Sequence, residues 1–173
     1  MGEPAEERDG MLLDAPSDAA ASPSASAAPE PFAQPLPPPR CEVRELTFAV
    51  EQLGGLRRTL TSWAGEQRMP PAPTEELVLA VNELATNSIR HGGGAGKLLL
   101  WRESDRLVCE IRDAGHIDDA LIGRSPPAPN QHTGRGLWLV HQLCDVVEIH
   151  SSPAGTAVRV HKRTAEQNGG SES

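Results

Sequence analysis

The sequence has few cysteines, and their placement argues against two kinds of site. Cys41, Cys109 and Cys144 are an odd number of residues, far apart in the chain, and two of them fall in apolar patterns. This placement is typical of small buried hydrophobic side chains in a reducing compartment. Neither a disulfide framework nor a zinc site is therefore expected.

The sequence also lacks long hydrophobic runs. No window approaches the roughly 18 consecutive apolar residues that a membrane span needs. No basic region near the N-terminus is followed by an apolar stretch of about seven or more residues, as in a signal peptide. We therefore expect a soluble, cytoplasmic protein that makes no contact with a membrane.

A basic stripe is lacking as well, because the charge of the chain is concentrated in its ends. The formal net charge is −8, of which the first forty residues supply −5 from seven acids and two bases, and residues 164–173 supply −2. The remainder is nearly neutral and has no clustered lysines and arginines of the kind that nucleic-acid binding requires. Direct binding to DNA or RNA is therefore not expected.

The first forty residues also differ in composition from the rest. They are rich in alanine, serine and acidic residues, and nine of the 16 prolines lie before Arg40. Such a segment has too few apolar side chains to bury, so burial cannot offset the conformational entropy that folding costs. We predict a disordered tail over residues 1–40, one domain over 41–163 and a second disordered tail over 164–173. A domain of this length can enclose one hydrophobic core.

Hydrophobic periodicity predicts an alternation of strands and helices within this domain. The order is strand, two helices, two strands, loop, helix and two strands, with the second helix beginning at Thr74 as a capping hydroxyl. The predicted ranges are 41–50, 51–67, 74–91, 97–102, 106–112, 114–133, 134–144, 145–152 and 156–163. This order predicts an α+β two-layer sandwich, a mostly antiparallel mixed sheet that about three helices cover on one face.

The second helix carries a polar pair that could do chemistry. Glu83 and Asn87 stand one turn apart and present a carboxylate and a neutral oxygen ligand, a suitable arrangement for a base beside a metal ion. The alternative is that this is simply the solvent-exposed face of an amphipathic helix. Leu79 and Ala80 lie within about 60° of Glu83 on the helical wheel, which favours a face that looks into a covered pocket.

Two strand residues are expected to point toward the core. By the period of two, Asp113 shares a face with Leu107, Cys109 and Ile111, and such a carboxylate needs hydrogen-bond donors or a ligand. The alternative is that Asp113 only starts a turn. Thr156 shares a face with the inward valines of the last strand, where the alternative is an ordinary β-branched residue.

The run GRGL, residues 134–137, follows the long loop and opens a predicted helix. The backbone N–H groups at a helix start favour anions, although glycines serve flexible loops equally well. Arg135 could bond a phosphate or could simply be solvated. The glycines 92–94, by contrast, are predicted to end the preceding helix with a residue in the left-handed conformation.

Four short motifs in this order resemble those of the Bergerat-fold ATPases, the gyrase, histidine-kinase and mismatch-repair type. ELATN at 83–87 is similar to the N box, DAG at 113–115 to the first glycine box, GRGL at 134–137 to the second, and GT at 155–156 to the final strand motif. The stretch LVLAVNELATNSIRHG also resembles the small bacterial anti-sigma serine kinases of the partner-switching class. The resemblance covers about residues 43–163.

This resemblance implies ATP and Mg²⁺ as cofactors and a role for each motif residue. Glu83 would act as the catalytic base for the incoming hydroxyl, and Asn87 would hold Mg²⁺ against the phosphates. Asp113 would accept a hydrogen bond from the adenine amino group, with Thr156 supporting it. The other nucleotide-binding residues that the resemblance implies are Gly115, Gly134, Arg135, Gly136 and Leu137.

The resemblance further implies an ATP-dependent protein serine/threonine kinase that is also an anti-sigma factor. Its partners would be a sigma factor and an antagonist, the anti-anti-sigma protein, and it would form a homodimer. Residues 116–133 would form the lid over ATP. One departure lies at Ile117, where the first glycine box usually has a second glycine. A nucleotide-binding regulatory protein without turnover and the catalytic domain of a histidine kinase are the alternatives.

Overall fold

The computed structural model describes residues 32–119, 122–126 and 134–164. These residues form five strands and three α-helices, with one short 3₁₀ turn at Val50–Gln52. The strands are β1 (Arg44–Ala49), β2 (Ala95–Glu103), β3 (Arg106–Asp113), β4 (Val146–Ser152) and β5 (Gly155–Arg163), and the helices are α1 (Leu53–Glu66), α2 (Pro71–His91) and α3 (Arg135–Leu143). The predicted order of elements is confirmed. Residues 1–31, most of the predicted N-terminal tail, and residues 165–173 lie outside the described residues.

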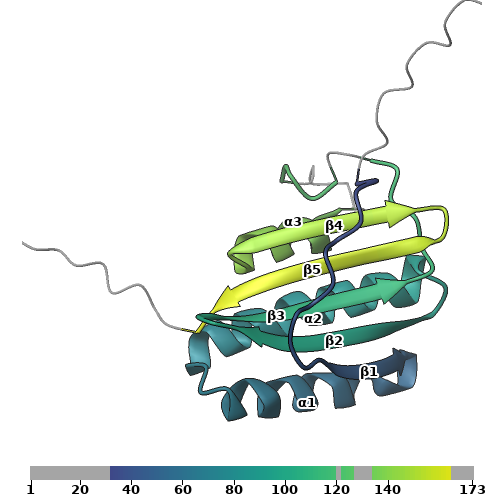
Figure 1. The fold of residues 1–173 in the computed structure, drawn as a ribbon. Coiled ribbons are helices and arrows are strands. Elements are labelled where there is room, and N and C mark those ends of the chain that lie inside the picture. The colour runs from purple at the N-terminus through teal and green to yellow at the C-terminus, as the bar shows by residue number, and fades with distance from the viewer. Residues whose placement is uncertain (1–31, 120–121, 127–133, 165–173) are drawn as a thin grey trace, which may run out of the picture.

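The strands form a single sheet in the order β1-β2-β3-β5-β4, and the three helices cover one of its faces (Figure 1). Each of the four strand pairings is antiparallel, so the parallel pairing that a mixed sheet would need is not found among the described residues. The hydrophobic core lies between this face and the helices. In the β3–β5 register, Asp113 lies directly opposite Thr156, which brings the ends of two distant strands together.

The start of α2 differs from the prediction. The helix begins at Pro71, three residues before Thr74, and Thr74 lies inside it with its hydroxyl donating to the Pro70 carbonyl at 2.8 Å. Proline is well suited to this first position because its ring fixes φ near the helical value and the missing N–H would have no partner there. The end of α2 agrees with the prediction: Gly92 follows the last helical residue, and Gly93 has a φ of +91°.

The opposite face of the sheet is crossed by the segment that leads into β1. In Figure 1 this segment, coloured dark purple, runs over the sheet on the side away from the helices. The carbonyl of Phe32 accepts from the Ser151 amide at 2.9 Å, and the carbonyl of Pro37 accepts from Arg159 at 2.8 Å. Residues 32–40 were predicted as part of a disordered tail, and here they contact β4 and β5. Their prolines lower the entropy that ordering costs, since each ring already fixes φ.

A buried ion pair lies beneath this segment. Glu110 is 0% exposed, and its two carboxylate oxygens accept from Arg159 Nε at 2.7 Å and from Arg112 Nε at 2.6 Å. The Arg159 guanidinium also lies 5.0 Å from the centre of the Trp101 ring. These contacts compensate for the removal of the carboxylate from water.

The three cysteines are free; Cys109 is buried, Cys144 is partly buried and Cys41 is exposed. Within the described ranges, no helix has the length and apolar character to cross a membrane.

Candidate functional site

A cavity of about 400 Å³ lies where α2, α3 and the ends of β3 and β5 meet. Its wall includes seven of the nine residues predicted for the site: Asn87, Asp113, Gly115, Gly134, Gly136, Leu137 and Thr156. These residues come from parts of the chain up to about seventy positions apart. Arg135 is exposed at the first position of α3 and is not part of the wall. Glu83 lies beside the cavity, next to Gly136.

The start of α3 packs directly against the polar pair of α2. A Cβ atom at position 136 would lie 3.0 Å from Glu83 Oε2 and 3.3 Å from Asn87 Nδ2, so only glycine allows this approach without displacement. Gly134 precedes the helix with a φ of +86°. The carboxylate and the amide therefore lie at the positive end of the α3 dipole, where an anion is favoured.

Leu79 does not face the cavity as the helical wheel predicted, although Asn87 on the same helix lines the cavity wall. Leu79 is 40% exposed and lines no part of the cavity, while Ala80 is fully buried in the core. Nearer the start of α2, the Glu76 carboxylate pairs with the Lys162 ammonium. It is the packing of α3 that covers Glu83 and Asn87, and a helical wheel for α2 alone cannot show this.

Asp113 is held in place by two donors. Its Oδ2 accepts from the Ser88 hydroxyl at 2.6 Å, and its Oδ1 accepts from the Gly115 amide at 2.8 Å. Each carboxylate oxygen can accept a second hydrogen bond, so Asp113 can also accept from a ligand in the cavity. Ser88 is not one of the residues predicted for the site. The sequence signal for it is a hydroxyl on the buried face of a helix, since a buried hydroxyl needs a partner.

Gly92 has a second role beyond ending α2. A Cβ atom at this position would lie 2.4 Å from the carboxylate carbon of Asp113. The Gly92 carbonyl also accepts from the Ala114 amide at 3.0 Å, which joins the end of the helix to the end of β3. The Gly92 backbone, which carries no side chain, therefore packs directly against the Asp113 carboxylate.

Directly opposite Asp113 in the β3–β5 pair lies Thr156, which is buried and lines the cavity. Its hydroxyl donates to the Gly115 carbonyl at 2.8 Å and lies 2.8 Å from the Ser151 hydroxyl. Asp113 and Thr156 therefore form one polar part of the cavity wall, and the start of α3 forms another. Such a site suits a ligand that carries both a hydrogen-bond donor and an anionic group.

The residues present fit a magnesium ion only if the ligand brings part of its coordination. The described residues contain no cluster of three His, Cys, Asp or Glu side chains that could hold a metal alone. Asn87 and Glu83 provide side-chain oxygens beside the anion-favouring helix start. Mg²⁺ commonly binds to one or two protein oxygens, several waters and the phosphates of a bound nucleotide.

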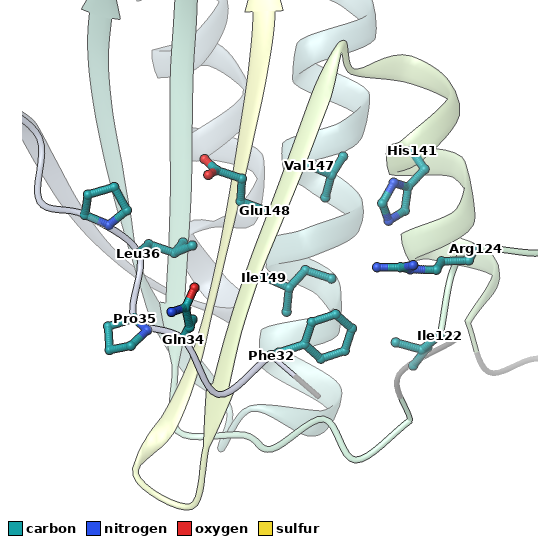
Figure 2. A pocket seen from close by; sticks show the side chains of 11 residues that line it. Phe32, Gln34, Pro35, Leu36, Ile122, Arg124, His141, Val147, Glu148 and Ile149 are labelled. Carbon is teal, nitrogen blue, oxygen red and sulfur yellow. The ribbon is translucent and has the colours of Figure 1, made fainter. Parts of the chain in front are cut away.

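A second cavity, of about 330 Å³, lies at the free edge of β4 and contains none of the predicted site residues. Figure 2 shows Phe32 of the N-terminal segment beside Ile149, with Arg124 and His141 pointing into the same space. Burial, and to a lesser degree the charge of Arg124, lower the pKa of His141 below its usual value. Ile122 lines both cavities.

Comparison with known proteins gives a family and one curated relative. A family model described as a histidine kinase-like ATPase domain matches residues 46–162. The serine-protein kinase RsbW of Bacillus licheniformis is 31% identical, over a match that spans 57% of this chain and 71% of that protein.

One solved structure supports the fold. The RsbU and RsbW domains of Rv1364c from Mycobacterium tuberculosis superpose with a TM-score of 0.56 at 16% identity, over 73% of this chain and 33% of that chain. The chain thus spans about a third of that solved protein. The histidine kinase AdeS of Acinetobacter baumannii gives a TM-score of 0.45 at 10% identity, over 73% of this chain and 70% of that chain.

Proposed function

The chain belongs to the histidine kinase-like ATPase domain family, and we propose that it is an ATP-dependent protein serine/threonine kinase and anti-sigma factor. The family match spans most of the chain, and the curated relative is a serine-protein kinase. The observation that carries the proposal is the approach of Gly136 to Glu83 and Asn87, which places a carboxylate and an amide at an anion-favouring helix start. The polar end at Asp113 and Thr156 lies in the same cavity.

Each residue of the site has a proposed role in binding. Asp113 accepts a hydrogen bond from the adenine amino group, and Thr156 supports it from the neighbouring strand. Gly115 positions Asp113 through its amide, which donates to Oδ1. Gly134, Gly136 and Leu137 shape the phosphate end, and Arg135 adds a positive charge at its rim. The side-chain oxygen of Asn87 is the protein ligand for Mg²⁺, which neutralises charge on the phosphates when bound.

Glu83 is the proposed catalytic base. It takes the proton of the attacking serine or threonine hydroxyl while the hydroxyl oxygen bonds to the terminal phosphorus and the bond between that phosphorus and ADP breaks. Its carboxylate lies against Gly136 and beside Asn87, where the phosphates would bind. A positioned base of this kind contributes about 10²- to 10⁴-fold in rate.

The proposed partners follow from the relationship to the RsbW kinase. The chain would hold a sigma factor and would phosphorylate an anti-anti-sigma antagonist in the cytoplasm. We also propose a homodimer. Light scattering at micromolar concentration should give twice the mass of one chain, and the mass of a single chain would contradict the dimer.

Phosphoryl transfer from labelled Mg-ATP to the antagonist protein tests the proposed activity. Glu83→Gln should lower the transfer rate about 10²-fold or more, because the base is lost, while ATP still binds. Glu75→Gln is the matched control, since Glu75 lies on the same helix but is exposed and outside the cavity wall. An unchanged rate in Glu83→Gln would refute the role of Glu83.

The same experiment separates the kinase from a regulatory protein that only binds nucleotide. If the wild-type chain retains labelled ATP for hours without hydrolysis and no phosphoprotein forms with any partner, the kinase activity is refuted. Chelation of Mg²⁺ should stop transfer. Transfer that continues in excess chelator would count against the role assigned to Asn87.

A further inference from the structure

Ser151 of β4 joins the start of the lid segment to the adenine end of the cavity. It is 1% exposed, and its hydroxyl oxygen lies 2.8 Å from the Ile117 amide nitrogen and 2.8 Å from the Thr156 hydroxyl. A third neighbour, His116 Nδ1, lies at 3.2 Å. None of the motifs found in the sequence includes Ser151.

We propose that Ser151 is a positioning residue for the nucleotide, which donates to the Thr156 hydroxyl and holds the backbone at Ile117. Ser151 lies behind Thr156, outside the cavity wall, and so acts through its neighbours rather than on the ligand. The inference rests on the proposed ATP site and adds a residue to it.

The donors and acceptors around Thr156 determine which way its hydroxyl points. A carbonyl can only accept, so Thr156 donates its one proton to the Gly115 carbonyl. In the 2.8 Å contact between the two hydroxyls, Ser151 must therefore be the donor. Thr156 keeps one lone pair for the cavity, which means that it presents an acceptor and no donor to a bound base.

Ser151 also anchors the residue that departs from the glycine-box pattern. Where related ATPases usually have a second glycine, this chain has Ile117, whose β-branched side chain restricts the backbone. The Ile117 amide donates to Ser151. The Ser151 amide in turn donates to the Phe32 carbonyl, so the N-terminal segment and the lid segment are bonded to one residue.

The cluster resembles a hydrolytic triad in its order but is not arranged for catalysis. Asp118 Oδ1 lies 2.6 Å from His116 Nε2, and His116 Nδ1 lies 3.2 Å from the Ser151 hydroxyl. Ser151, however, is buried, donates its proton to Thr156 and accepts from Ile117. A nucleophile needs an accessible lone pair and a proton that it can give to the histidine. Positioning is therefore the role that fits.

Nucleotide affinities of the full chain test this role. Ser151→Ala should raise the Kd for Mg-ATP about tenfold, because Thr156 loses its donor and the Ile117 amide loses its acceptor. Ser152→Ala is the matched control, because the Ser152 hydroxyl bonds within the β4–β5 turn, and it should leave the Kd for Mg-ATP within about twofold.

The outcomes separate this inference from the proposed function. If the wild-type chain does not bind Mg-ATP, the proposed function fails. If the wild type binds but Ser151→Ala keeps its Kd for Mg-ATP within about twofold, the positioning role is overturned. Should Ser151→Ala not fold, Ser151→Cys keeps nearly the same volume with weaker hydrogen bonds. In either variant the Ile117 amide should exchange its hydrogen faster, and unchanged protection would also overturn the inference.

Discussion

At the scale of single residues, Gly92 leaves no room for a side chain beside the Asp113 carboxylate. A Cβ atom there would lie 2.4 Å from Asp113 Cγ. Gly92→Ala should therefore displace the carboxylate and raise the Kd for ATP about tenfold or more, because a misplaced acceptor costs about 1 to 3 kcal/mol. Calorimetric titration with Mg-ATP measures the change.

A glycine in an open position is the control for this substitution. Gly65 of α1 has no atom within 4 Å of a built Cβ, so Gly65→Ala should leave the Kd unchanged. It should also stabilise the chain by about 0.5 to 1 kcal/mol, because alanine loses less entropy in a helix. Equal ATP affinity in Gly92→Ala and Gly65→Ala would contradict the role of Gly92.

The inward direction of Asp113 and Thr156 was predicted correctly because strand residues alternate between faces regardless of the rest of the fold. Ser88, Gly92 and Ser151 were not predicted as site residues. Their contacts reach residues 21 to 35 positions away along the chain: Asp113 for both Gly92 and Ser88, and His116 and Ile117 for Ser151. A local pattern cannot report such contacts, since they depend on which strand ends the sheet places together.

At the scale of elements, the ion pair between Glu110 of β3 and Arg159 of β5 stabilises the face of the sheet that is turned away from the helices. Arg159→Met should lower the free energy of unfolding by about 3 kcal/mol, because Glu110 stays buried without its main partner. Urea unfolding followed by circular dichroism measures the change. Arg112→Met is the matched control: Arg112 bonds the same carboxylate from a side chain that is 50% exposed, so its loss should cost less than about 1 kcal/mol. Similar losses of unfolding free energy in Arg159→Met and Arg112→Met would refute the larger contribution of Arg159.

Element types were predicted better than element limits. The alternation of apolar residues identifies each strand and helix, since burial on one face imposes a period. The start of α2 at Pro71 was missed because Thr74 has the composition of a cap, while its hydroxyl bonds a carbonyl inside the first turn. Residues 32–40 were predicted to be part of a tail because composition reports only how much apolar surface a segment itself carries. Their contacts are to β4 and β5, which come more than a hundred residues later in the chain.

At the scale of the whole molecule, the buried thiols predict a loss of stability at alkaline pH. Burial raises the pKa of Cys144 to about 12 and raises that of Cys109 as well. The unfolded thiols ionise from about pH 9, so the folded state loses stability as the pH rises from there toward 12, by up to about 1.4 kcal/mol per pH unit for each thiol. The chain has no tyrosine, whose titration would overlap.

Denaturant unfolding at pH 8 and pH 10.5 measures this effect. Cys144→Ala should show a smaller loss between the two pH values than the wild type, because one ionisation is removed. Cys41 is exposed, so Cys41→Ala should behave as the wild type does. A pH dependence that is the same in all three proteins would exclude the thiols as its cause.

The sequence by itself determined the order and type of the elements and the motifs that identify the family. These properties depend on periods and residue types within short stretches, which every fold containing them must satisfy. Only the tertiary structure decided how the site is closed. Here α3 packs against Glu83 and Asn87, and the backbone of Gly92 packs against Asp113. Ser151 bonds both Ile117 and Phe32, which are distant from it in the chain. Such contacts exist only once the sheet has brought the ends of its strands together.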